Sequence, residues 1–214
     1  MNGRLIIAKI RIRFHKLGDI RFISHHDLMK VFERAIRRAN IPIAMSKGFN
    51  PHPKLSIPIA LSVGIAGKDE VLELELPESM PPEILAERLG RQLPKGIHIL
   101  SGEAMPCSPR SSVCDVLYEV VFKDQGLPTT ERISEFLQQS SIIVNRTKDG
   151  YSKPFDIRPS IQEITVTPNG LILSIKMESE GMARPEEVIH SLCGNEKKGL
   201  FEITRIKVNL SSSA

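Results

Sequence analysis

Two histidines stand beside a carboxylate in the run Ser24-His25-His26-Asp27. A serine followed three positions later by an acidic residue is typical of a capping box, so we predict that Ser24 and Asp27 cap a helix. A helix start also presents free backbone N–H groups to anions, and His25 and His26 either contact phosphate there or lie on a plain surface. Adjacent histidines rarely point at one ion, and no third ligand follows at a recognisable spacing. We therefore expect no metal site.

A second place for chemistry is the loop Gly48-Phe49-Asn50-Pro51-His52-Pro53-Lys54. Its two prolines fix φ, which would hold His52 and Lys54 in place. Phe49 could stack on a base, and Lys47 and Lys54 could neutralise phosphates. The alternative is a rigid connector whose Phe49 fills the core.

Positive charge is concentrated near the start of the chain. Residues 1–54 hold twelve Lys and Arg against three Asp and Glu, whereas residues 55–214 hold seventeen against twenty-two. This asymmetry suggests a polyanion partner, RNA above all. Acidic residues are scarce beside these cations, so we expect little mutual neutralisation. The predicted anion-binding residues are Arg11, Arg13, Arg21, His25, His26, Lys30, Arg34, Arg37, Arg38, Lys47, Phe49, His52 and Lys54.

Hydrophobic periodicity predicts the elements that would position these residues. Residues 5–14 alternate as a half-buried strand with Lys9, Arg11 and Arg13 on its outer face. The helix after Ser24 has an apolar stripe that ends near Ala39, with cations on its outer side. The remaining predicted elements of this half are strands at 41–45, 57–63, 71–76 and 97–105, a loop at 46–56 and a helix at 81–93.

The same order of elements returns after a Pro- and Ser-rich linker at residues 106–112. It predicts strands at 113–122, 142–145, 161–166, 171–177 and 201–210, helices at 130–139 and 185–192, and a basic loop at 148–159. We therefore predict an α+β protein with two ferredoxin-like βαββαβ units in tandem and antiparallel sheets. The domains would be 1–106, which is basic, and 113–214. The alternative is one mixed α/β domain of six to eight strands.

Other features limit the class of protein. Cys107, Cys114 and Cys193 have no paired spacing, which indicates a reducing compartment. Residues 1–14 lack the continuous apolar stretch of a signal peptide, and no run of about 18 apolar residues occurs. Nucleotide-binding glycine motifs, HExxH and GxSxG are absent. We expect a cytoplasmic protein without a cofactor and without a membrane partner.

Three blocks of sequence together resemble the radical-SAM-linked protein family. They read F-x-S-H-x-D from Phe22, R-A-x-R-R-A from Arg34 and G-F-x-P-H-P-K from Gly48. The resemblance is dense over residues 14–76 and looser beyond, where it includes Arg158-Pro159 and Arg184-Pro185. Members of that family occur alone or fused behind a cobalamin-binding radical S-adenosylmethionine (SAM) protein. This chain lacks CxxxCxxC, so the resemblance implies an accessory protein with a radical SAM partner.

Two functions follow as expectations. In the first, a basic cleft presents RNA or another anionic substrate to the radical SAM partner. In the second, the chain is itself an RNA-processing or RNA-modifying enzyme, because paired ferredoxin-like units resemble CRISPR endonucleases and some pseudouridine synthases. His25 or His52 would then act as a general base with Lys54 stabilising charge, or Asp27 as a nucleophile. The characteristic loop of the endonucleases and the Arg-Thr-Asp stretch of the synthases are missing, which favours the first. A shared catalytic site requires His25, His52 and Lys54 around one concavity.

Overall fold

The computed structural model describes residues 8–106, 112–123, 126–148, 150–194 and 201–211. Within these ranges the chain is a mixed α+β protein with four α-helices and mostly antiparallel strand pairing. It divides into two compact units, residues 1–112 with 211–214 and residues 113–210. None of the described helices is long and apolar enough to cross a membrane.

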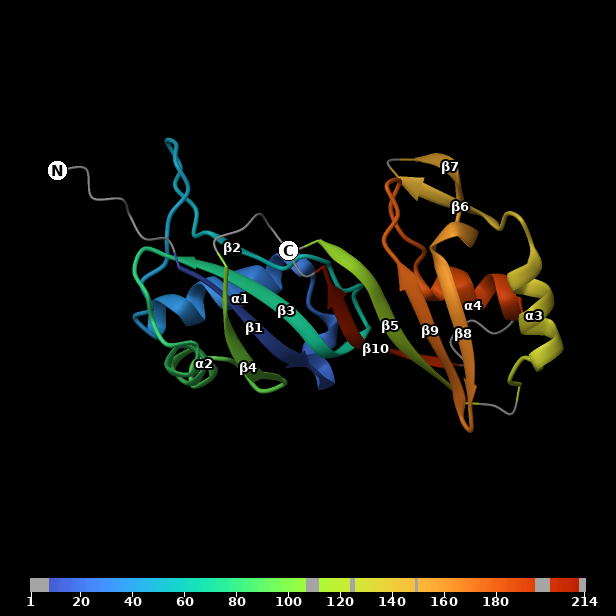
Figure 1. The fold of residues 1–214 in the computed structure, drawn as a ribbon, viewed down its shortest axis with the longest axis horizontal. Coiled ribbons are helices and arrows are strands. Elements are labelled where there is room, and N and C mark those ends of the chain that lie inside the picture. The colour runs from blue at the N-terminus through green and yellow to red at the C-terminus, as the bar shows by residue number, and fades with distance from the viewer. Residues whose placement is uncertain (1–7, 107–111, 124–125, 149, 195–200, 212–214) are drawn as a thin grey trace. The chain divides into compact units, whose positions relative to one another are not determined.

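Unit 1 is a small sheet with two helices packed on one of its faces (Figure 1). The sheet has the order β4-β1-β3, and β2 pairs with the other side of β3. All three pairings are antiparallel. The elements in chain order are β1 (Ala8–Lys16), the 3-10 helix η1 (Gly18–Phe22), α1 (His25–Arg38), β2 (Leu55–Ser56), β3 (Ala66–Leu76), α2 (Pro82–Gly90) and β4 (Ile97–Met105).

The core of unit 1 lies between the helices and the sheet because alternate residues of each strand point toward the helices. Ile10, Ile12 and Phe14 of β1 are buried there, at 1% exposure or less. The ring of Phe14 meets that of Phe32 from α1 edge to face, with centroids 4.9 Å apart. Such a pair adds about 0.5–1.5 kcal/mol beyond its buried area, which ties α1 to β1.

Unit 2 has a sheet of the order β10-β5-β9-β8 and a separate two-stranded ribbon, β6-β7. Side chains of β5, β9 and both helices form its buried interior. The elements are β5 (Val113–Phe122), α3 (Thr130–Gln138), β6 (Ile143–Lys148), β7 (Tyr151–Asp156), the 3-10 helix η2 (Arg158–Ser160), β8 (Ile161–Thr167), β9 (Gly170–Lys176), α4 (Pro185–Cys193) and β10 (Phe201–Leu210).

Four predicted segments differ from the structure. Residues 57–63 form no strand, because Pro58 lacks the N–H that a ladder needs. The two-residue strand β2 lies instead at the end of the predicted loop 46–56. Residues 41–45 contribute only an isolated bridge at Met45. The basic loop predicted at 148–159 contains β7, whose six residues pair with β6. Pro154 is tolerated there because a two-stranded ribbon leaves one edge of each strand unpaired. Part of the predicted linker, residues 107–111, lies outside the described residues.

Candidate nucleic-acid interface

The start of α1 is capped as its sequence predicts. The hydroxyl oxygen of Ser24 accepts from the backbone N–H of Asp27 at 3.1 Å, and the hydroxyl donates to the Asp27 carboxylate at 2.6 Å. The hydrogen bond from Ser24 is the largest cause of a lowered pKa for Asp27, with smaller contributions from the charges of Lys30 and His26. Asp27 is therefore an ionised capping group, and this engagement counts against its use as a nucleophile.

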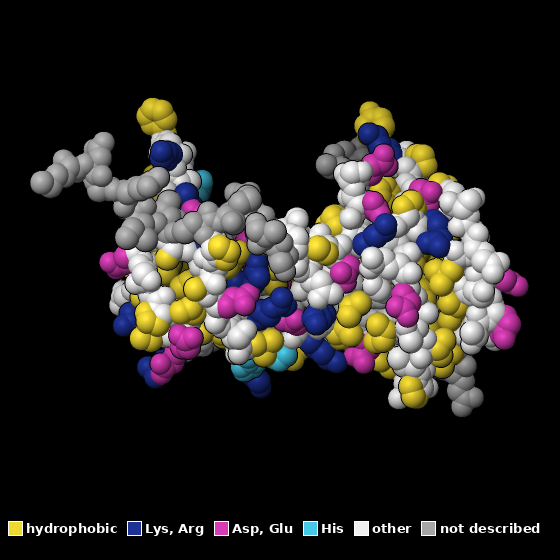
Figure 2. Space-filling view, viewed as in Figure 1, with side chains coloured by type: hydrophobic (Ala, Val, Ile, Leu, Met, Phe, Trp, Pro, Cys, Tyr) yellow, Lys and Arg dark blue, Asp and Glu magenta, His cyan; other side chains and the backbone are white. Residues whose placement is uncertain are grey.

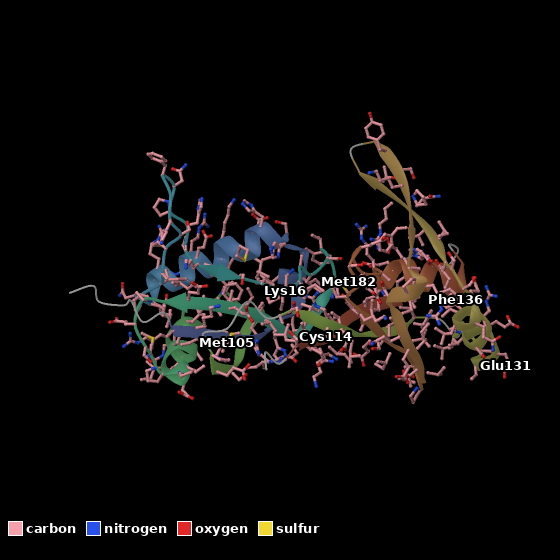
Figure 3. All side chains as sticks on the ribbon, turned by 45° about the horizontal axis from the view of Figure 1, so that its top comes forward. Lys16, Met105, Cys114, Glu131, Phe136 and Met182 are labelled. Atoms are coloured by element: carbon pink, nitrogen blue, oxygen red, sulfur yellow. The ribbon has the colours of Figure 1, made fainter. Side chains whose placement is uncertain are left out.

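A buried lysine supports this capped end, and the sequence analysis did not identify it. Lys16, the last residue of β1, is 0% exposed and continues the buried side of the strand. Figure 3 labels its position. Its ammonium donates to the carbonyl oxygens of Arg21 at 3.3 Å and Ile23 at 3.1 Å, just before Ser24. The period-2 pattern of β1 could have revealed it, because Lys16 continues the buried series two residues beyond Phe14.

The outer face of β1 is not the free basic surface that was expected. Strand β3 places Glu75 and Glu73 directly across from Lys9 and Arg11, and Asp69 within reach of Arg13. The expectation of scarce acidic neighbours was therefore wrong for Arg11 and Arg13. Figure 2 shows Lys/Arg and Asp/Glu side chains mixed on the visible face of this unit. The ion pairs are Lys9–Glu75 (4.0 Å), Arg11–Glu73 (3.2 Å), Arg11–Glu103 (2.9 Å) and Arg13–Asp69 (2.7 Å).

The solvent face of α1 carries the cations that remain available. Five exposed side chains recur every one to four residues along one side of the helix and form what we call the α1 stripe: His26, Lys30, Arg34, Arg37 and Arg38. Arg38 is anchored, because it donates to the carbonyl oxygen of Gln92 at 2.5 Å. In the described part of the chain, the side chains of Arg34 and Arg37 have no ion-pair or hydrogen-bond partner. Lys30 likewise makes no ion pair or hydrogen bond through its side chain among these residues, although its charge acts on the nearby Asp27. Arg34 and Arg37 can neutralise phosphates without first losing an existing partner.

Arg21 and His25 lie near the start of α1, at the opposite end of the helix from the loop of residues 48–54. Arg21 lies within η1, and its guanidinium carbon is 4.9 Å from the centroid of the Phe22 ring. His25 is the first residue of α1 and is half-buried. A helix of fourteen residues is about 20 Å long, so α1 separates His25 from the segment that follows Arg38.

That segment forms a narrow projection, residues 45–53, which we call the arm (Figures 1 and 2). Its foot is closed by the Met45–Pro53 bridge and by a hydrogen bond from the Ser46 N–H to the His52 carbonyl at 2.8 Å. Phe49 near its tip is 107% exposed, so it does not fill the core. Gly48 beside it has a φ of 132°, a conformation that side chains with a Cβ rarely adopt.

His52 and Lys54 lie together in a pocket of about 260 Å³ at the foot of the arm. The pocket also includes Glu75, which contacts the ammonium of Lys54 at 2.6 Å. Neither His25 nor Asp27 is among the residues that line it. The structure thus joins two of the four catalytic candidates and gives Lys54 an acidic partner, an arrangement suited to binding more than to a base–nucleophile pair.

In unit 2, the two Arg-Pro pairs noted in the sequence have structural roles. The guanidinium of Arg158 donates to the carbonyl oxygen of Leu137 at 2.6 and 3.0 Å and to that of Ile161 at 2.9 Å. It therefore neutralises the end of α3, where the helix dipole favours a cation. Arg184 precedes α4, and its backbone N–H donates to Glu187 at 2.9 Å.

Replacing Arg158 with alanine is expected to destabilise unit 2 by about 2–4 kcal/mol, because three carbonyl hydrogen bonds from a charged donor are lost. Hydrogen exchange of the α3 amides measures this loss. Arg184→Ala is the matched control, since its side chain is 64% exposed and makes only a 3.9 Å ion pair. Equal protection of α3 in the two variants would contradict the assigned role.

Within the described residues, no group of three or more His, Cys, Asp or Glu side chains is placed to hold a metal ion. The arrangement on unit 1 instead offers free guanidinium groups on α1 and an exposed aromatic ring on the arm. These are the groups with which proteins contact the phosphates and bases of a single strand.

Two solved structures are distantly similar to this chain. An unknown protein from Galdieria sulphuraria is 11% identical, with 96% of this chain and 99% of that chain covered and a TM-score of 0.29. A putative glycine cleavage system transcriptional repressor is also 11% identical, with 97% and 99% covered and a TM-score of 0.26.

Comparison with curated proteins finds no match. At the level of families, residues 9–189 match DUF2344, described as an uncharacterized protein conserved in bacteria. The matched range includes α1, the arm and the pocket of unit 1, together with unit 2 as far as α4. The chain therefore belongs to the DUF2344 family.

Proposed function

We propose that unit 1 binds single-stranded RNA through the α1 stripe and the arm, and presents it to a radical SAM partner enzyme. The main support for RNA binding comes from Arg34 and Arg37. Both side chains are exposed on one side of α1 and have no ion-pair or hydrogen-bond partner among the described residues. Phosphate contacts from such residues supply most of the sequence-independent affinity for nucleic acids.

The arm supports a single strand in preference to a duplex. Phe49 is fully exposed on a narrow projection, and an exposed aromatic ring is costly in water unless it has a partner. An unpaired base can stack on the ring, whereas the bases of a duplex are stacked on each other. Lys47 and His52 are also exposed on the arm and add charge or hydrogen bonds beside the ring.

We further propose that each unit is a ferredoxin-like βαββαβ fold. In support, β1, α1, β2, β3, α2 and β4 follow one another with the sheet order 4-1-3-2, counted within the unit. In unit 2 the strands β5, β8, β9 and β10 have the same order, with the ribbon β6-β7 inserted after α3. The arm and the ribbon thus occupy the same place in the order of elements.

Salt dependence tests the RNA proposal directly. Binding of a labelled single-stranded RNA is measured by fluorescence anisotropy from low to high salt, in the wild type and in Arg34→Ala/Arg37→Ala. Each phosphate contact contributes about 0.7 to the magnitude of the slope of log K against log salt. The slope of the double variant is therefore expected to be smaller than that of the wild type by about 1.4. At about 0.15 M salt, its affinity should fall roughly tenfold.

The matched control, Arg88→Ala/Arg91→Ala, removes one exposed arginine from α2 and one from its C-cap. It has the same net charge as Arg34→Ala/Arg37→Ala. Its slope is expected to remain that of the wild type. Equal slopes in all three proteins, or an affinity that does not change with salt, would overturn the RNA proposal.

The partner rests on the resemblance to the radical-SAM-linked proteins. Affinity purification of the tagged chain is expected to recover a protein with the CxxxCxxC motif and its iron–sulfur absorbance. Recovery of RNA without any such protein would contradict the proposed radical SAM partner, and the proposed RNA binding would still stand.

A further inference from the structure

The pocket at the foot of the arm contains a set of charges that the proposed binding of phosphates does not use. Its walls include two acidic and two basic side chains, and its volume is about 260 Å³. That volume equals roughly nine molecules of liquid water, enough for one planar base. A pocket with both signs of charge is suited to a neutral ligand that has donors and acceptors, more than to a phosphate.

The two carboxylates each keep an oxygen with unused acceptor capacity. One oxygen of Glu75, Oε2, contacts Lys54 at 2.6 Å, while Oε1 is 4.0 Å from Lys9, beyond hydrogen-bond distance. Oε1 of Glu73 accepts from Arg11 at 3.2 Å, and no partner is recorded for its Oε2 in the described part of the chain. These side chains are 27% and 11% exposed, respectively. Burial of this degree strengthens a hydrogen bond that a ligand makes to them.

Donors stand beside these acceptors. The ammonium groups of Lys9 and Lys54 flank Glu75 on two sides. The pocket is also lined by Pro53 and Leu55, which supply apolar surface for the flat faces of a ring. This lining suits a planar ligand that presents adjacent N–H donors to a carboxylate and acceptors to a lysine.

Resting on the proposed RNA binding, we infer that this pocket takes one guanine base of the bound strand. Guanine presents N–H groups at N1 and N2 that a carboxylate can accept together, and acceptors at O6 and N7 for a lysine. Adenine has only one amino group on its corresponding edge, with acceptors beside it. Glu73 or Glu75 would read the donor edge, while Lys9 or Lys54 would donate to the acceptors.

The position of the pocket fits a strand that also reaches Phe49. The tip residue Phe49 is four residues from the foot residues Met45 and Pro53, and so at most about 14 Å along the arm. Neighbouring nucleotides of one strand can therefore stack on the arm and enter the pocket.

The test compares a labelled oligouridine with versions that carry one central guanine, adenine or inosine. Inosine keeps O6, N7 and the N1–H of guanine but lacks its amino group. The wild type is expected to prefer guanine over adenine by about 5- to 150-fold, with inosine between them. Glu73→Gln or Glu75→Gln should abolish this preference while leaving the affinity for plain oligouridine within about twofold.

Glu103→Gln is the matched control, because it removes an acidic partner of Arg11 outside the pocket. Its guanine preference should equal that of the wild type, and thermal melting checks that each variant is folded. Equal affinity of the wild type for the guanine and adenine strands would overturn the guanine pocket, as would an unchanged preference in both pocket variants. If the salt slope still falls in Arg34→Ala/Arg37→Ala, the proposed function stands without the pocket, whereas absence of any RNA binding would overturn both.

Discussion

Phe49→Ala is expected to weaken binding of single-stranded RNA by about 1–3 kcal/mol, which is about 5- to 150-fold in Kd. The ring is fully exposed on the arm, so its removal takes away a stacking partner for a base without removing a core contact. The melting temperature should therefore remain unchanged. Anisotropy titration with one labelled RNA at fixed salt measures the loss.

Three further variants test whether this loss is specific to an aromatic ring on the arm. Phe49→Tyr keeps an aromatic face and should bind as the wild type does, whereas Phe49→Leu keeps apolar volume and should resemble Phe49→Ala. Tyr151→Ala removes the 77% exposed ring of the ribbon in unit 2, and its affinity should not change. Wild-type affinity in Phe49→Ala would contradict stacking on the arm. A loss of affinity of equal size in Tyr151→Ala would show that the effect is not particular to Phe49.

Lys16→Met is expected to lower the free energy of unfolding of unit 1 by about 3 kcal/mol. Methionine keeps the buried hydrocarbon stem but loses the charged donor to the carbonyl oxygens of Arg21 and Ile23. Hydrogen bonds with a charged partner contribute about 1.5–3 kcal/mol each, and distances of 3.1 and 3.3 Å place both near the lower value. Thermal melting, with hydrogen exchange of the first turn of α1, measures the effect.

Lys95→Ala is the matched control, because it removes an exposed lysine from the loop between α2 and β4. A surface change of that kind is expected to stay within about 0.5 kcal/mol. RNA affinity of Lys16→Met, measured well below its melting temperature, should be near that of the wild type, because Lys16 is fully buried. Similar stability of Lys16→Met and Lys95→Ala would contradict the role of Lys16 in holding the start of α1.

Local signals in the sequence determined the elements whose residues interact along the chain. Ser24 three positions before Asp27 predicted the cap of α1, because a capping hydrogen bond joins neighbours in sequence. The apolar alternation of residues 5–14 predicted a strand where the structure has β1, and the 3.6-residue period predicted the buried side of α1. The exposed cations of α1 followed directly, since a helix that buries one side must expose the other.

The sequence failed where distant residues meet. A charge count over residues 1–54 treated Arg11 and Arg13 as free, because their carboxylate partners lie at least 56 positions later, on β3 and β4. Only strand pairing brings those groups within ion-pair distance, and strand register depends on the whole sheet. The charge count likewise missed the acidic partner of Lys54, because Glu75 lies 2.6 Å from it but 21 positions later in the chain.

Tertiary structure also decided which of the histidine and proline motifs belong together. His25 and His52 look alike in the sequence, as residues of one basic block. Helix α1, about 20 Å long, lies between them, so His52 joins Lys54 and Glu75 in the pocket while His25 stays at the capped end. The sequence by itself therefore determined where positive charge and the exposed motifs occur. Only the fold decided which charges remain unpaired and which side chains share a site, because both depend on contacts between residues far apart in the chain.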